Sequence, residues 1–159
     1  MSQHRLTTPL EGVPASIWDP LAPIAAPLQL CNPLVSADWV DYNGHMSESC
    51  FLLVFGDNSD AFFRFIGIDE AYRNDLKMSL YTFQTMIFNI KEAAEGEPLK
   101  LTLQLLDADA KRVHIFHSMY HSTSGELLAT GEQMLMHVDM EKGKSCAMPQ
   151  ELQDKLQAI

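Results

Sequence analysis

The longest apolar segment of the chain covers residues 47–67 and has the spacing of a helix. At three- and four-residue steps it carries Phe51, Phe55, Asn58, Phe62 and Phe65. Apolar residues between them cover most of the helical circumference, which predicts a buried helix rather than an amphipathic surface helix. Ser47 or Ser49 can cap its start, and Gly67 can end it.

Four later segments alternate or are rich in aromatic and β-branched residues, which predicts strands. They cover residues 79–90, 99–106, 112–121 and 126–138. The turn sequences EGEP, DADAK and STSG separate them, so we expect antiparallel hairpins and a four-strand meander.

Residues 28–35 predict one more short strand, which Pro33 interrupts. Five of the eight prolines fall in the first 27 residues, and each removes a backbone donor. We therefore divide the chain into an extended N-terminal arm (residues 1–27), a folded domain (28–140) and a C-terminal tail (141–159). Apolar side chains such as Leu10, Ile17 and Trp18 predict that the arm packs on its own domain or on a neighbouring subunit.

The order of strand, buried helix and four strands fits an α+β architecture in which a curved antiparallel sheet wraps around one long helix. One sheet face does not cover a helix that is apolar nearly all round. A second subunit would extend the sheet and remove an exposed edge strand, so we expect a homodimer or a higher homo-oligomer.

Composition narrows the class of protein. The 159 residues suffice for one domain with a sizeable core, and 47% apolar and 20% charged residues are typical of soluble globular proteins. No apolar run is long enough to span a bilayer, and three cysteines without a CxxC pair favour a reducing cytoplasm. The net charge of −10 argues against nucleic acid as a partner.

Between the first strand and the helix lies a polar motif, DYNGHMSESC, at residues 41–50. Asp41 is the natural carboxylate to attack a carbonyl or to activate water. Gly44 lets a substrate approach the backbone, and the N–H groups near Gly44, His45 and Met46 lie where the helix begins, a position that favours negative charge. The alternative is that Asp41 only ties a turn through an Asx hydrogen bond.

Other polar residues offer further roles. Asn43 can orient the carboxylate or a water, and His45 can cap the helix, contact the substrate or be purely structural. Glu48 and Asp57 are alternative carboxylates. The polar stretch GDNSD that contains Asp57 is expected to face solvent, and Cys50 is expected to pack rather than to act as a nucleophile.

Three histidines, His114, His117 and His121, would share one face of a helix, as a metal site requires. The β-branched and aromatic residues around them favour a strand instead, and a strand turns His114 away from the other two. We therefore expect no metal site.

The first strand, the Asp-x-x-Gly-His-Met motif, the long helix and the later strands resemble the hotdog-fold acyl-CoA thioesterases of the 4-hydroxybenzoyl-CoA thioesterase family. The blocks WVDYNGHM, KRVHIFH and LLATGEQMLMHVD look like the thioesterases of carnitine breakdown, which cleave betainyl-CoA. Ser47 and Glu48 stand where the family often has an Asn-Asn pair. The resemblance implies a cofactor-free thioester hydrolase whose catalytic aspartate is Asp41.

A betainyl group carries a permanent trimethylammonium charge, which aromatic faces attract. The candidates to line its pocket are Trp39, Tyr42, Tyr81 and Phe83, of which the last two are expected to share one face of a strand. No glycine-rich phosphate loop is present, so coenzyme A would be held by scattered cations such as Lys91, Lys100, Lys111 and Arg112.

Two rival functions stay open. One is an acyl-CoA hydratase on the same fold, which is expected to carry Asp-x-Asn-x-x-His; this chain has Asp41-x-Asn43-x-His45, one residue short. The other is a hotdog-shaped module that binds acyl-CoA without catalysis.

Overall fold

The computed structural model describes residues 18–159, and residues 1–17 lie outside that description. The packing expected for Leu10 and Ile17 of the arm therefore falls outside the described residues. Trp18 is described, and its ring centroid lies 5.2 Å from that of Phe65. Within residues 18–159, none of the helices is long and apolar enough to cross a membrane.

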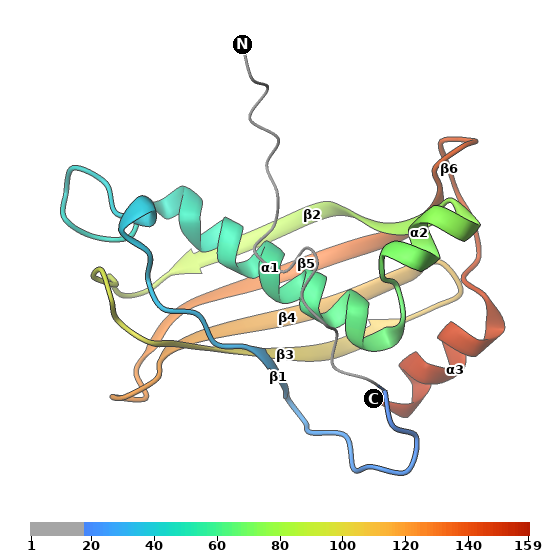
Figure 1. Cartoon of the computed structure of the whole chain (residues 1–159), viewed down its shortest axis with the longest axis horizontal. Helices are drawn as coiled ribbons and strands as arrows, with labels where there is room; N and C mark the ends of the chain where they lie inside the picture. Colours follow the sequence, from blue (N-terminus) through green and yellow to red (C-terminus); the bar gives the residue numbers. More distant parts are fainter. Residues whose placement is uncertain (1–17) are drawn as a thin grey trace.

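The elements follow one another as β1 (Leu28–Cys31), the 3-10 helix η1 (Ala37–Trp39), α1 (Glu48–Ile66), α2 (Glu70–Leu76), β2 (Met78–Asn89), β3 (Leu99–Ala108), β4 (Arg112–His121), β5 (Leu127–Asp139), β6 (Lys144–Ser145) and α3 (Gln150–Ala158). Figure 1 shows α1 lying across one face of the sheet, with α2, β6 and α3 at one end of it. The predicted helix and the four predicted longer strands are confirmed to within two residues at each end.

The strands pair in the order β1-β3-β4-β5-β2, with β6 beside β5. The prediction of a four-strand meander is wrong for β2, which pairs with β5 from Met78 to Asn89 and not with β3. The segment 90–98 crosses the end of the sheet instead of closing a hairpin. Its nine residues can span about 30 Å, whereas β2 and β3 are only about 15 Å apart across β5 and β4, so the segment is long enough to connect them. β2 is therefore an edge strand.

Helix α1 begins and ends where the sequence predicts. Ser47 is its N-cap residue, although the Ser47 side chain makes no capping hydrogen bond, and Gly67 ends the helix with a φ of 99°. Phe55 and Phe62 are fully buried. A Cβ atom on Gly131 of β5 would lie 2.9 Å from the Phe55 ring, so α1 approaches the sheet closely because this position lacks a side chain.

The polar stretch of α1 does not face solvent, contrary to the prediction, because Asp57, Asn58 and Ser59 are at most 5% exposed. Asn58 Nδ2 donates to His117 Nδ1 at 2.9 Å, and Ser59 Oγ donates to Gln133 Oε1 at 2.6 Å. Burial lowers the pKa of His117 to about 4, so its imidazole stays neutral. Partners from β4 and β5 thus stabilise the buried polar groups of Asn58 and Ser59.

The histidines of β4 take separate partners, as a strand requires. His114 Nε2 lies 2.7 Å from Glu132 Oε1 on the face away from α1, whereas His117 is fully buried beneath the helix. His121 Nδ1 accepts the backbone N–H of Thr123 at 3.3 Å in the following turn.

Residues 141–159, predicted to be a C-terminal tail, contribute β6 and α3 to the folded domain. Leu152 and Leu156 of α3 belong to the same buried cluster as Phe62 and Val113. This helix closes the core at the end of the sheet that carries the β3–β4 turn, where Met148 N–H donates to Ala110 O.

Candidate active site

Residues 39–47 form a small hairpin that leads directly into α1. Val40 and Met46 pair as an isolated antiparallel bridge, and Asp41 N–H donates to His45 O at 3.1 Å. The three residues between Asp41 and His45 are the loop of this hairpin. Three-residue hairpin loops commonly end on a residue with positive φ.

Gly44 occupies that position, with a φ of 79°. Its N–H donates to Asp41 O at 3.0 Å, which closes the turn. L-residues with a side chain avoid this conformation, so the turn itself requires glycine here. Asn43 contributes its backbone N–H, which donates to Asp41 Oδ1 at 2.8 Å, while the residue is exposed. The Asx turn expected as the alternative is therefore present, and it orients the Asp41 carboxylate.

The alternation within the hairpin sets the direction of each side chain. Met46 points into the core and is 5% exposed. In an antiparallel pair, opposite residues share a side and the next pair points the other way. Asp41 and His45 therefore project together on the surface side of the hairpin, where both are half-buried.

A second carboxylate joins this surface from the segment after β2. His45 Nε2 lies 3.3 Å from Glu92 Oε2. Met46 N–H donates to Ala93 O at 2.7 Å, which holds that segment against the hairpin. Sequence reasoning missed Glu92, because no periodicity marks a loop residue and its contact with His45 is distant along the chain.

Two of the three backbone donors expected near the motif are already engaged. Gly44 N–H and Met46 N–H are already bonded to backbone oxygens. The first N–H groups of a helix have no acceptor within it, and the Ser47 side chain does not cap them. The donors available to an anion are therefore the His45 N–H of the hairpin and those of Glu48 and Ser49 in the first turn of α1, where the helix dipole also favours negative charge.

The four candidate aromatic residues do not gather within one chain. Tyr42 lies beside Asp41 and is 96% exposed, whereas Trp39 is partly buried against the core. Tyr81 and Phe83, 53% and 54% exposed, lie toward the other end of β2, and a register shift at Phe83 interrupts the alternation expected for them. At about 3.3 Å per residue, Phe83 is about 20 Å along the strand from Asn89, the end nearer the hairpin.

The alternative carboxylates are placed differently from Asp41. Glu48 is exposed at the first position of α1. Asp57 is buried in the helix, and desolvation followed by the neighbouring charge of Asp60 raises its pKa to about 6. Cys50 lies partly buried against the core cluster of Phe51 and Val54, as expected for packing.

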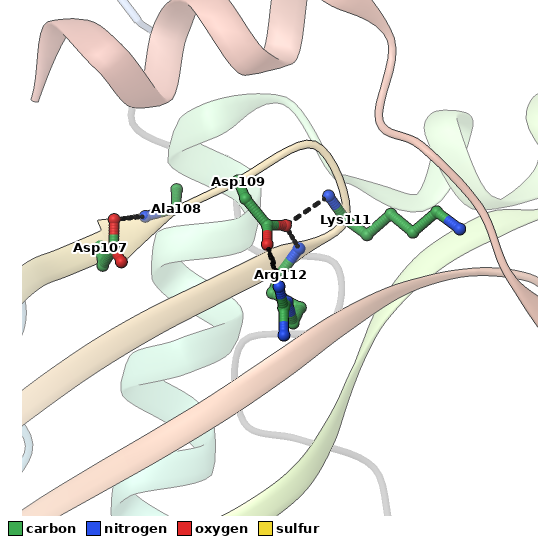
Figure 2. A network of polar contacts seen from close by, with 5 residues as sticks. All are labelled: Asp107, Ala108, Asp109, Lys111 and Arg112. Atoms are coloured by element: carbon green, nitrogen blue, oxygen red, sulfur yellow. Dashed lines mark hydrogen bonds and ion pairs between the residues drawn. The ribbon is translucent and has the colours of Figure 1, made fainter.

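Cations gather at the opposite end of the sheet, around the β3–β4 turn and β6; they are Lys77, Lys111, Arg112, Lys142 and Lys144. Figure 2 shows the turn, where Asp109 accepts the backbone N–H groups of Lys111 and Arg112 and the Arg112 Nε–H at 2.7 to 2.8 Å. These hydrogen bonds, the Lys111 N–H first among them, lower the pKa of Asp109 to about 2.

A pocket of about 420 Å³ opens beside this turn and is lined by Asp109, Ala110, Lys111, Arg112, Met136 and Ser145. The Lys111 side chain extends away from Asp109 in Figure 2. The other two cations considered from the sequence are engaged elsewhere. Lys91 pairs with Glu126, and Lys100 Nζ lies 5.1 Å from the centroid of the Tyr120 ring.

Comparison with known proteins relates both the sequence and the fold to thioesterases. The chain is 48% identical over 133 residues to an L-carnitine dehydrogenase/betainyl-CoA thioesterase of Rhizobium sp., covering 84% of this chain and 27% of that protein. This chain thus spans about a quarter of that bifunctional relative. It is also 38% identical over 125 residues to a betainyl-CoA thioesterase of Pseudomonas aeruginosa, covering 79% of each.

Among solved structures, a hypothetical protein of Staphylococcus aureus in complex with CoA superposes with a TM-score of 0.78 at 25% identity, covering 86% of this chain and 85% of that one. A putative thioesterase of Pseudomonas putida has a TM-score of 0.72 at 31% identity, covering 82% and 83%. Residues 35–156, which contain the hairpin, α1 and the long strands, match the thioesterase-like superfamily. The chain therefore belongs to the thioesterase-like superfamily, and its curved antiparallel sheet around a central helix is the hotdog fold.

Proposed function

We propose that this protein hydrolyses betainyl-CoA to betaine and coenzyme A in the cytoplasm, where acyl-CoA thioesters are made and used, and that it needs no cofactor. The observation that carries the proposal is the position of Asp41, an oriented surface carboxylate immediately before the N-terminus of a long helix. The names of the relatives from Rhizobium sp. and Pseudomonas aeruginosa support the choice of acyl group.

In the proposed reaction, Asp41 attacks the thioester carbonyl or removes a proton from the water that does so. Negative charge then develops on the carbonyl oxygen, and the N–H groups of Glu48 and Ser49 stabilise it. Collapse of this intermediate breaks the carbon–sulfur bond, and the CoA thiolate leaves and takes up a proton. Water, directly or through an acyl-Asp41 intermediate, supplies the oxygen of the betaine carboxylate.

The enzyme is proposed to act as a homodimer built on the edge of β2. Five large side chains along this strand and directly after it are 46% to 60% exposed, and they are Tyr81, Phe83, Met86, Phe88 and Ile90. The unpaired N–H and C=O groups of an exposed apolar edge strand of this length can pair with a strand of another chain. A second copy pairing antiparallel to it supplies both the missing hydrogen bonds and the apolar cover.

Self-pairing of β2 would place residues of both chains around each site. If the exposed stretch from Tyr81 to Ile90 pairs with itself antiparallel, the partner's Tyr81 lies opposite Ile90 of the first protomer. The end of β2 that is remote from the hairpin in one chain then comes level with the hairpin of the other. Aromatic side chains that lie apart in a single chain, Tyr42 and the partner's Tyr81 and Phe83, thus flank one acyl pocket and favour its cation.

The same proposed pairing would bring the phosphates of coenzyme A to the basic end of the partner. Lys111 N–H donates to Asp109 Oδ1, and Lys111 O accepts the His137 N–H. His137 pairs with Leu80, so Lys111 lies at the end of β2 that is remote from the hairpin. Antiparallel pairing therefore brings Lys111 and Arg112 toward the partner's hairpin. Within one chain the two ends are about 30 Å apart along β2, longer than the pantetheine arm. Each site therefore takes its carboxylate from one protomer and its phosphate-binding cations from the other.

Release of free thiol from a panel of acyl-CoAs, followed with a thiol-reactive dye, tests the proposal. We expect release from betainyl-CoA with the highest kcat/KM of the panel. A hydratase would add water to an enoyl-CoA without releasing thiol, and a binding module would do neither. Sedimentation across dilution completes the test, because we expect no stable folded monomer at micromolar concentration.

A further inference from the structure

The carboxylate of Glu92 lies on the same surface as Asp41, although it belongs to neither the motif nor α1. His45 Nε2 lies 3.3 Å from Glu92 Oε2, and the adjoining Ala93 carbonyl accepts the Met46 N–H at 2.7 Å. Two contacts therefore fix the start of the loop after β2 against the hairpin. Because Asp41 and His45 form one cross-strand pair, the group that touches the His45 ring lies on the same side of the hairpin as the Asp41 side chain.

The charge on Glu92 is available to a ligand. Its side chain is 75% exposed, and His45, its ion-pair partner among residues 18–159, carries a compensating charge only when protonated. The adjacent cation, Lys91, is already paired with Glu126 across the end of the sheet. Neutral His45 therefore leaves a full negative charge beside the surface on which Asp41 projects.

A betainyl group needs a negative charge at this place. Its nitrogen is two bonds from the scissile carbonyl carbon, about 2.5 Å away for bonds of about 1.5 Å. Whenever Asp41 reaches that carbon, the trimethylammonium group is held within a few ångströms of the same carboxylate. It cannot lose its charge through deprotonation, so only groups next to Asp41 can compensate it.

We propose that Glu92 is the specificity-determining counter-charge for the trimethylammonium group of the substrate, an inference that rests on the proposed betainyl-CoA hydrolysis. Glu92 contributes binding to the cationic acyl group and none to a neutral group of the same shape. The His45 imidazole positions the Glu92 carboxylate toward the acyl group.

The experiment compares betainyl-CoA with 3,3-dimethylbutyryl-CoA, in which a tert-butyl group replaces trimethylammonium. We expect Glu92→Gln to lower the ratio of kcat/KM values, cationic over neutral, by about three- to tenfold, mainly through KM, as suits a single exposed charge at short range. Glu95→Gln is the matched control, because it removes the same charge from an exposed residue of the same loop. It should leave the ratio within about twofold of wild type.

Binding is measured as well, by calorimetric titration of both esters into the Asp41→Asn variant with and without Glu92→Gln. This readout separates the inference from the proposed function, because it needs no turnover. A rise in the ratio of Kd values, betainyl-CoA over 3,3-dimethylbutyryl-CoA, with Glu92→Gln supports the counter-charge even if neither ester is hydrolysed. Equal weakening of both esters, or an equal loss of preference with Glu95→Gln, would overturn it.

Discussion

The two ends of the sheet differ in charge, and the difference matches the two ends of the proposed substrate. The hairpin end carries Asp41, Glu48, Glu92, Glu95 and Glu97, whereas the opposite end carries five of the eleven lysines and arginines of an acidic chain, interspersed with Asp107, Asp109, Asp139 and Glu141. Betainyl-CoA has a cationic acyl group at one end and phosphates at the other. A single chain presents these charges about 30 Å apart, and in the proposed antiparallel dimer the partner brings them to one ligand.

The ends also differ in how their charges are held. At the hairpin end, backbone hydrogen bonds orient Asp41, and a long helix points its N-terminus at the same surface. At the basic end, Asp109 and Asp139 pair with Arg112 and Lys142. Lys111 and Lys144 have no ion-pair partner among residues 18–159 and remain available to phosphates. Under the proposed function, the hairpin end carries out the hydrolysis and the basic end binds the phosphates of coenzyme A.

The largest expected effect is the loss of kcat caused by a substitution at the hairpin end. Asp41→Asn keeps the shape of the side chain, and its amide oxygen still accepts the Asn43 N–H, but it removes the attacking or activating group. We expect kcat for betainyl-CoA to fall by about 10² to 10⁴, with the folded dimer intact. Steady-state kinetics with sedimentation checks this. Near-normal kcat in the folded variant would move the chemistry to Glu48 or His45.

The core between the two ends holds two titrating groups with opposite effects on stability. His117 has a folded pKa of about 4, below its unfolded value of 6.5, so its contribution is present above pH 6.5 and is lost as the pH falls toward 4. Asp57 has a folded pKa of about 6, above its unfolded value of 3.8, so its contribution is present below pH 3.8 and is lost as the pH rises through 6.

The titration of each group changes the free energy of unfolding by about 3 kcal/mol between the folded and unfolded pKa values of that group. Relative to wild type, His117→Gln should therefore gain stability on acidification from pH 7 to 4, and Asp57→Asn should lose it. Urea unfolding at several pH values measures both slopes. Parallel curves for the two variants and wild type would show that the polar cluster of α1 does not titrate with folding.

At the basic end, reversal of charge should weaken anchoring while leaving the chemistry alone. Lys111→Glu combined with Arg112→Glu is expected to raise KM about tenfold and to change kcat by less than about twofold, since the phosphates are remote from the thioester. The matched control is Lys100→Glu, a cation of β3 that lies over the Tyr120 ring. An equal rise in KM for the control would mean that only net charge matters.

The smallest effect concerns the hairpin turn. A Cβ on Gly44 meets nothing within 4 Å, so Gly44→Ala costs only the strain of a positive φ, about 1 to 2 kcal/mol. Gly56→Ala is the control, because a Cβ there also meets open space but lies in the middle of α1, where alanine should stabilise by about 1 kcal/mol. Thermal unfolding distinguishes the two signs. Stabilisation by both substitutions would contradict the turn geometry.

Much of this fold was accessible from the sequence, and what was missed is non-local. Helix α1 and its ends follow from the phenylalanine spacing, Ser47 and Gly67, because each signal lies within the element it describes. The pairing of β2 with β5 has no such signal, since the alternation that marks a strand does not name its neighbour, and EGEP resembles a hairpin turn. The polar residues Asn58 and Ser59 likewise predicted a solvent-facing stripe, because their hydrogen-bond partners are not local. Those partners, His117 and Gln133, lie more than 50 residues further along the chain.

The candidate site divides in the same way. Asp41 and Gly44 stand out because the hairpin turn is local, and the bonds between residues 41 and 45 were foreseeable as an Asx turn. The contact between His45 and Glu92 could not be predicted, because it joins residues that are distant in the sequence. The same holds for the cations: only the three-dimensional structure shows that Lys91 is paired with Glu126 while Lys111 is not.

The central claim, that each site is shared between two protomers, is tested most directly by mixing subunits. Asp41→Asn chains and Lys111→Glu/Arg112→Glu chains, carrying different tags, are co-expressed, and the heterodimer is purified and assayed with betainyl-CoA below KM. A shared site gives the heterodimer one intact Asp41 opposite one intact basic end, so we predict about half the wild-type dimer's activity. Activity no higher than half that of the charge-reversed homodimer would show that each chain builds its site alone and would contradict the account.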